Sequence, residues 1–238
     1  RKTLDDLQDE LTRQARAIWG ELFANHFERY ISVVIPKPGS YRARMGVAGY
    51  YNPMNNSLVA SSIGMVLRHE FTHALHFGDQ SARGQQHPIW VLEGFATLFE
   101  TSDYEGTRLV PKDSRRLLSL QMQLKRKRIP SLKTMMEWTH PQFMQRAAAG
   151  YPMSRYFMMY LYREGKLRQW YDAYTDGYED DRTGKAATEK VFGKDIEEVD
   201  ADWRKWAADL KAPDLYVRDS QPYMGILSRP LGTGLELM

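Results

Sequence analysis

Residues 67–77 read LRHEFTHALHF, and the way this stretch folds decides what the rest of the chain must build around it. His69 and His73 are four residues apart, and on an α-helix this spacing places two side chains one above the other on the same face. Both imidazoles can then reach one ion. Glu70 is rotated by about 100° around the helix axis from His69 and flanks that ion. The spacing therefore predicts a metal-binding helix with a carboxylate beside a metal-bound water.

The composition of the 238-residue chain is that of a globular protein without cysteine. An apolar content of 42% is enough for a core, in one large domain or two small ones. Because cysteine is absent, a metal site must be built from His, Asp and Glu side chains. The longest apolar runs, such as Ile31–Ile35, are far shorter than the roughly 18 residues of a membrane span, so no integral membrane segment is expected.

The charge of the chain is nearly balanced. A formal net charge of +3 is small for this length, and it does not favour nucleic acid as a partner. One basic run, Lys125–Arg128, follows a helical pattern that begins near Ser114. Basic side chains stabilise the C-terminal end of a helix, so we interpret the run as a solvated helix end, with an acidic partner as the alternative.

We expect an α+β fold in which a helix and a small N-terminal mixed sheet precede a mainly α-helical part. Apolar residues at helical spacing predict a first helix from Thr3 to about Phe27. Residues 31–35 and 57–61 are expected as strands, and residues 46–56 as a turn or hairpin arm. Helices are then expected over 63–77, 89–101, 112–127, 131–137, 151–163, 166–175, 184–192 and 195–210. The expected division is 1–62 for the helix and sheet, 63–212 for the helical part and 213–238 for a C-terminal extension.

The helix expected at residues 89–101 offers a third metal ligand. Catalytic zinc keeps three protein ligands and leaves its fourth position for water. Residues 89–100 read IWVLEGFATLFE, and Glu93 lies 20 residues after His73 (93 − 73). The intervening glycine, polar residues and Pro88 are enough for a loop that returns the second helix alongside the first. Gly94 would let these two helices approach closely. We therefore expect Glu93 to complete the site.

Two nearer side chains are alternatives to Glu93. Asp79 follows His73 by six residues, which is similar to the metzincin pattern, but His76 stands where that pattern has a turning glycine and would prolong the helix. Asp79 would then lie beyond reach of the ion. His76 itself is roughly 10 Å along the helix axis from His69, too far to share one zinc ion, and is expected to pack or to cap.

The two blocks HEFTH and WVLEGFATLFE together resemble the gluzincin zinc metallopeptidases, in particular peptidase MA-like proteins, which are similar to the catalytic domains of thermolysin and aminopeptidase N. In these proteins the third zinc ligand is the glutamate of an E-G-x-A stretch. The resemblance covers residues 63–101 and extends more loosely to about residue 210. It implies that residues 1–212 form a gluzincin-like metallopeptidase domain.

Carried over to this chain, the resemblance implies one zinc ion held by His69, His73 and Glu93, with Glu70 as the general base. A zinc ion lowers the pKa of its water, and an adjacent carboxylate can take the proton and pass it to the leaving amine. Glu100 lies seven residues after Glu93 on the same helix face, so it is expected to orient a ligating imidazole. The alternative for Glu100 is a solvated helix charge.

A tyrosine is the expected donor to the oxyanion. The resemblance implies this role for Tyr151, which is expected to stand just before a helix about sixty residues after the third ligand. Among fourteen tyrosines, a purely structural role for Tyr151 is the alternative, with Tyr156 as the substitute donor.

The expected partner is a peptide or protein substrate. Relatives place an edge strand before the metal helix to pair with the substrate backbone, which implies that Leu58, Val59 and Ala60 bind substrate. Aminopeptidases of this type hold the substrate's free amine with the glutamate of a G-x-M-E-N segment, whereas residues 49–56 here read GYYNPMNN, without a carboxylate. An endopeptidase is therefore expected. The alternatives are an aminopeptidase with an atypical amine anchor and a catalytically silent zinc- or peptide-binding module.

The last part of the sequence has a different character. Residues 222–226 and 232–237 resemble the opening strands of a PDZ domain, and the alternative is a plain C-terminal strand. Because the chain begins at Arg1 and not at a methionine, either an N-terminal leader was removed or the chain is a piece of a longer protein. The sequence leaves the localisation open and favours an extracytoplasmic protein, secreted or periplasmic. The sequence predicts no oligomeric state.

Overall fold

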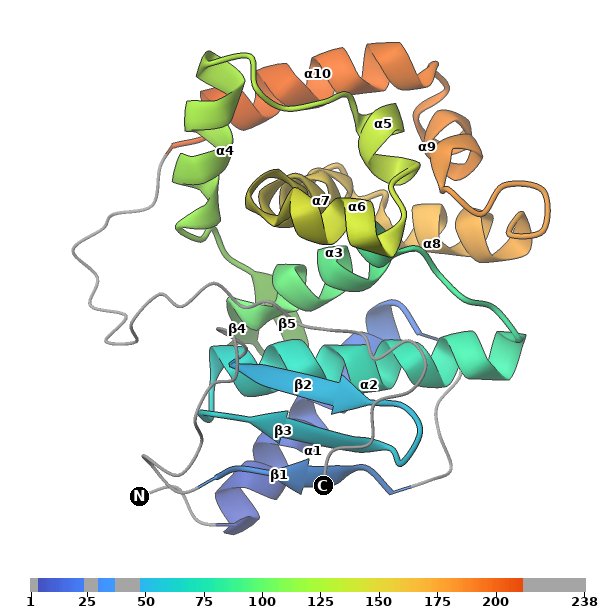
Figure 1. The fold of residues 1–238 in the computed structure, drawn as a ribbon. Helices are drawn as coiled ribbons and strands as arrows, with labels where there is room; N and C mark the ends of the chain where they lie inside the picture. The colour runs from blue at the N-terminus through green and yellow to red at the C-terminus, as the bar shows by residue number, and fades with distance from the viewer. Residues whose placement is uncertain (1–3, 24–29, 37–47, 212–238) are drawn as a thin grey trace.

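The structure is a computed structural model that describes residues 4–23, 30–36 and 48–211 (Figure 1). Within these ranges the fold is α+β, as expected: a small N-terminal sheet is followed by a mainly helical part, with ten helices and five strands in all. No helix in the described ranges is long and apolar enough to cross a membrane. The C-terminal extension, and with it the resemblance to a PDZ domain, lies outside the described residues.

The N-terminal part consists of one helix and a three-stranded mixed sheet. Its elements are α1 (Leu4–Glu21), β1 (Ser32–Val34), β2 (Gly49–Asn52) and β3 (Ser57–Ala60). The strand order is β1-β3-β2, with β1 parallel and β2 antiparallel to β3. A turn containing Asn56, at a φ of 49°, connects β2 to β3, and the Tyr51 hydroxyl donates to the Asn56 side chain at 2.9 Å. The turn or hairpin arm expected over residues 46–56 thus contains strand β2 and the turn that leads into β3.

The expectation of an edge strand at Leu58, Val59 and Ala60 is wrong. These residues form β3, which is the central strand, and its backbone pairs with β1 on one side and with β2 on the other. Leu58 and Ala60 are fully buried in the core. An added peptide strand cannot pair with a strand whose two edges are already occupied, so the backbone of β3 is not open to substrate.

The metal helix is longer than expected. It is α2 (Met65–Arg83), and Gly78 lies inside it instead of ending it. The helix stops at Gly84, which adopts the left-handed conformation at a φ of 67° that glycine tolerates at helix ends. After a short loop the chain enters α3 (Ile89–Glu100), as expected.

The remaining elements follow in the order β4 (Ser102–Glu105), β5 (Arg108–Pro111), α4 (Arg116–Lys125), α5 (Leu132–Met136), α6 (His140–Gln145), α7 (Ala147–Arg163), α8 (Leu167–Asp176), α9 (Lys185–Phe192) and α10 (Ile196–Asp209). The antiparallel hairpin of β4 and β5 and the short helix α6 were not expected from the sequence. Helix α7 begins four residues before Tyr151, so this tyrosine lies in the helix and not ahead of it.

Helix α3 is the centre of the molecule. It packs between α2 and α7, and every residue of it except Leu92 is buried (Figure 1). Gly94 permits a close approach, but to α7 and not to α2 as expected: a Cβ atom there would lie 2.9 Å from Met158 Cγ. Because α3 is held on both sides, the carboxylates that it carries have fixed positions.

Helix α1 supports the metal helix from the other side. The Arg68 guanidinium forms an ion pair with Glu10 of α1 at 2.9 Å and donates to the Ser102 carbonyl of β4 at 2.7 Å. The Gln14 amide donates to the Arg68 carbonyl at 3.1 Å and to the Thr72 hydroxyl at 3.3 Å. These bonds fix the turn of α2 from which the first histidine projects.

Candidate metal centre

The side chains of His69, His73 and Glu93 converge on one point between α2 and α3. One ligand atom of each lies within 4.8 Å of the other two. The two imidazole Nε2 atoms are 3.2 Å apart, and the Glu93 carboxylate lies 3.3 Å from Nε2 of His69 and 3.7 Å from Nε2 of His73. His69 and Glu93 are fully buried, whereas the His73 side chain is 12% exposed. The grouping expected from the sequence is therefore present, and it can hold a metal ion.

The separations in this group fit a tetrahedral ion. An ion bonded at about 2.0–2.1 Å holds its ligand atoms about 3.3–3.4 Å apart, close to the three distances measured. The chemistry also calls for a cation. Two imidazole nitrogens and a carboxylate face one another, and without a positive charge between them lone pairs and a negative charge would be buried together.

The electrostatics of the two histidines differ. Burial lowers the pKa of His69, but hydrogen bonds and charges from Glu100, Glu93 and Glu70 outweigh it and raise the pKa to about 10. Burial lowers the pKa of His73 to about 4. In the metal-free protein at neutral pH, a proton on His69 thus supplies the missing positive charge, and His73 is already neutral and ready to bind a metal.

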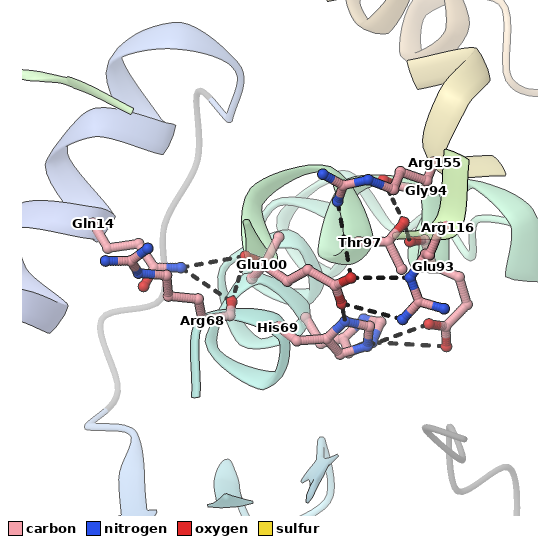
Figure 2. Close-up of polar contacts among 11 residues, drawn as sticks. Gln14, Arg68, His69, Glu93, Gly94, Thr97, Glu100, Arg116 and Arg155 are labelled. Atoms are coloured by element: carbon pink, nitrogen blue, oxygen red, sulfur yellow. Dashed lines mark hydrogen bonds and ion pairs between the residues drawn. The ribbon is translucent and has the colours of Figure 1, made fainter. Parts of the chain in front are cut away.

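Glu100 binds the far side of the His69 ring. Its Oε2 lies 3.0 Å from His69 Nδ1, and its Oε1 accepts from Arg116 Nε at 3.0 Å, with Arg155 Nη1 at 3.9 Å (Figure 2). Burial raises the pKa of Glu100, but Arg116, His69 and Arg155 outweigh it and hold the pKa at about 2. Glu100 is 2% exposed, so it is not the solvated helix charge that was the alternative.

Glu70 is buried beside this group and lacks hydrogen-bond partners of normal geometry. Neither carboxylate oxygen accepts such a bond from a described residue, and only the Tyr51 backbone offers a weak contact. Burial raises the pKa of Glu70 to about 8, opposed by the charge of His69. A buried carboxylate with free acceptors next to a metal site has the environment of a proton-transfer group.

Tyr151 is linked to the metal-binding group through two side chains, Arg116 and Glu100. It is buried, its ring packs against Phe143 at 5.4 Å between centroids, and the Arg116 guanidinium lies 5.3 Å from its ring centre. Tyr156, the substitute donor, has a hydroxyl that donates to the Ser114 carbonyl and accepts from the Ser114 N–H, both at 3.1 Å. Its hydroxyl is therefore committed to the backbone.

The alternative ligands lie elsewhere. Asp79 accepts hydrogen bonds from Arg83 at 2.9 Å and from the Tyr171 hydroxyl at 2.7 Å, and it is not part of the metal-binding group. His76 packs in the core, as expected: its ring stacks on Phe23, and its Nε2 lies 2.8 Å from Nδ1 of His87.

The loop between α2 and α3 is held in place by hydrogen bonds of residues that the sequence did not indicate as functional. The His87 N–H donates to the Gln80 side chain at 2.9 Å, and the His87 ring meets His76. Gln85 donates to the Thr175 carbonyl of α8 at 2.7 Å, and the Gln86 N–H donates to the Tyr178 hydroxyl at 2.9 Å. These contacts fix the start of α3 and so the position of Glu93.

Comparison with known proteins identified no relative of this chain. The chain matches no protein-family model, and neither a curated protein nor a solved structure is similar to it at a significant level. The residues of the site therefore carry any statement about function.

Proposed function

We propose that the protein is a zinc-dependent peptidase, and more specifically an endopeptidase. The observation that supports this most strongly is the convergence of His69, His73 and Glu93 within 4.8 Å beside the buried carboxylate of Glu70, which has only a weak contact with the Tyr51 backbone among the described residues. Two imidazoles and one carboxylate are the ligand set of many catalytic zinc sites, and they leave a position for water. Ligand separations close to those of a tetrahedral site favour zinc over larger cations that prefer oxygen ligands.

Zinc bound there would supply Lewis acidity, which polarises a carbonyl oxygen and makes water more acidic. Glu70 accepts a proton from the attacking water, whose oxygen forms the new bond to the carbonyl carbon. The same carboxylate then gives this proton to the amine nitrogen as the carbon–nitrogen bond breaks. Burial raises the pKa of Glu70 to about 8 before zinc binds, and the charge of a zinc ion nearby would favour the ionised carboxylate, which is the form that accepts a proton.

Glu100 and Tyr151 complete the proposed roles. Glu100 accepts a hydrogen bond from Nδ1–H of His69, which keeps Nε2 of that ring as the metal ligand. Tyr151 is the proposed donor to the oxygen of the tetrahedral intermediate, because the hydroxyl of Tyr156 is bound to Ser114.

We assign substrate binding to β2 in place of β3. In the described ranges β2 pairs only with β3, and it packs against the metal helix at Gly49, where a Cβ would lie 2.9 Å from Glu70 Cγ. An extended peptide paired with β2 would therefore run beside Glu70. The strand carries no carboxylate that could hold a free amine, which supports cleavage of internal peptide bonds.

Metal analysis combined with peptide digestion tests the proposal. The purified chain is expected to contain about one zinc ion and to cleave a peptide library, and a chelator is expected to stop cleavage until zinc is restored. Peptides with blocked N-termini should be cleaved as well as free ones. Cleavage restricted to free N-termini would indicate an aminopeptidase, and bound zinc without cleavage would indicate a silent binding module.

A further inference from the structure

Arg116 touches both halves of the proposed catalytic apparatus. It is the first residue of α4, and its Nε and Nη2 atoms lie 3.0 and 3.5 Å from the two oxygens of Glu100, which binds His69 (Figure 2). The same guanidinium lies 5.3 Å from the ring centre of Tyr151, within the range of a cation–π contact. No role follows for this residue from the metal ligands alone.

The contact with Glu100 holds a buried anion in place. A carboxylate that is 2% exposed stays ionised only if a cation compensates for its lost hydration. Arg155 is the other cation nearby, but its Nη1 is 3.9 Å from Glu100, beyond hydrogen-bond distance, and its Nη2 donates to the Lys112 carbonyl at 2.6 Å. Arg116 therefore carries most of the hydrogen bonding that orients the carboxylate toward His69.

The orientation of Glu100 affects how the His69 ring presents its nitrogen to a metal ion. With Glu100 bound to Nδ1 of His69 at 3.0 Å, Nε2 of that ring faces His73 and Glu93 and is the nitrogen that can bind a metal ion. A Glu100 side chain that lost the hydrogen bonds from Arg116 could turn away from His69, and the His69 ring would then lose the contact that fixes its orientation.

The contact of Arg116 with Tyr151 affects the position of the proposed hydrogen-bond donor to the substrate carbonyl. Tyr151 is on α7 and Arg116 is on α4, so the guanidinium bridges two helices. The flat guanidinium packs beside the aromatic ring while its edge hydrogen-bonds to the carboxylate, a combination that lysine cannot reproduce.

The geometry points to Arg116 as a positioning residue that couples the zinc ligand His69 to the oxyanion donor Tyr151. This inference rests on the proposed function. Arg116 acts through Glu100 on metal affinity and through Tyr151 on turnover, and it touches neither zinc nor substrate. Its removal should therefore weaken both properties, in contrast to removal of Glu70 or Tyr151 alone.

Zinc affinity and turnover are measured on the full chain, for the wild type and for Arg116→Lys and Arg116→Met. Competition with a chromogenic chelator gives the zinc Kd, and we expect Arg116→Met to weaken binding by about 10- to 100-fold. Arg116→Lys keeps the positive charge but cannot form the two hydrogen bonds of the guanidinium, so we expect a smaller loss of zinc affinity than in Arg116→Met. In zinc-saturated protein, kcat should fall in both variants with little change in KM. If Arg116→Met does not fold, Arg116→Lys decides.

Two further comparisons separate positioning from general stability. Arg204→Met is the control, because Arg204 is also an arginine paired with a carboxylate, Asp200, at 2.7 Å, although it is more exposed than Arg116 and lies on α10. It should lower the melting temperature without changing the zinc Kd. In a Glu100→Gln background, Arg116→Met should cost much less zinc affinity than it costs in the wild type, since its route to the metal is already cut.

Unchanged zinc affinity in both Arg116 variants, or a loss that is the same in the Glu100→Gln background, would overturn the inference. If the wild type binds zinc but cleaves no peptide, the proposed function fails, and the affinity comparison still decides the role of Arg116. A wild type that binds no zinc overturns both.

Discussion

Gly49 of β2 and Glu70 of α2 are packed so tightly that a Cβ atom on residue 49 would lie 2.9 Å from Glu70 Cγ. The same atom would lie 2.8 Å from the Val59 carbonyl oxygen and from Val66 Cγ1. The proposed general base thus lies directly beneath the strand that we assign to the substrate. Only glycine permits this distance, because every other residue carries a Cβ.

Gly49→Ala is expected to displace Glu70 or β2. Overpacking of this kind typically costs about 1–3 kcal/mol of unfolding free energy, which denaturant unfolding measures. We expect kcat to fall while zinc content stays near one ion per chain. Gly177→Ala is the control, since a Cβ there meets only the Ala173 carbonyl oxygen, at 3.2 Å, and no residue of the metal-binding group. Equal activity in the two variants would contradict the assigned closeness of β2 and Glu70.

Glu93→Ala and Glu70→Gln should have opposite effects on metal and on turnover. Glu93→Ala removes a ligand, so zinc is expected to be lost at micromolar metal concentrations. Glu70→Gln keeps the three ligands and should retain zinc, but turnover is expected to fall by about 10²- to 10⁴-fold. Zinc content by mass spectrometry and peptide cleavage rates check both. A Glu93→Ala protein that keeps its zinc would refute the ligand assignment.

Tyr151→Phe should lower kcat by about 10²- to 10³-fold without changing zinc affinity, because it removes one donor to the developing oxyanion. Tyr156→Phe is the matched change on the same helix. It removes two hydrogen bonds to Ser114 and is expected to cost about 1–3 kcal/mol of stability but little activity. If Tyr156→Phe were the less active of the two, the roles of the tyrosines would have to be exchanged.

Zinc affinity should rise with pH. In the metal-free protein the pKa of His69 is raised to about 10 and that of Glu70 to about 8, so both groups are largely protonated at pH 7. Zinc must displace the proton on His69, and its charge favours ionised Glu70. We therefore expect release of about one to two protons on binding at pH 7, measured by calorimetry in buffers of different ionisation enthalpy. Glu70→Gln should release fewer protons, because glutamine carries no ionisable proton.

The stability of the metal-free protein should change with pH in the opposite direction. A raised folded-state pKa contributes stability that is present below the unfolded-state pKa and is lost as pH rises through the folded-state value. This stability is lost between pH 6.5 and about pH 10 for His69, and between pH 4.5 and about pH 8 for Glu70. The lowered pKa values of His73 and His87 act in the opposite sense, but only below their unfolded value of 6.5. The difference in melting temperature between zinc-loaded and metal-free protein is therefore expected to grow from pH 7 to pH 9.

Local spacing allowed the sequence to predict the group of side chains that can hold a metal ion, and tertiary contacts explain what it missed. His69 and His73 share a helix face by helical geometry alone, and α3 delivers Glu93 as its pattern indicated. Arg116 reaches Glu100 from 16 residues away, after an unexpected hairpin, and no periodicity relates the two. Strand order is likewise not a local property, so β3 was wrongly expected at an edge. The helix expected over 63–77 continues to Arg83, because it ends only where Gly84 adopts the left-handed conformation.

The ring of His87, held between His76 and Gln85, fixes the α2–α3 loop without any help from an ion. In small zinc modules the metal supplies the folding free energy, and removing it unfolds the chain. Here the aromatic contacts and hydrogen bonds of the loop already place the third carboxylate. We therefore expect that the proposed zinc ion can leave and return while the chain stays folded, so that inactivation by a chelator and recovery with fresh metal involve no refolding.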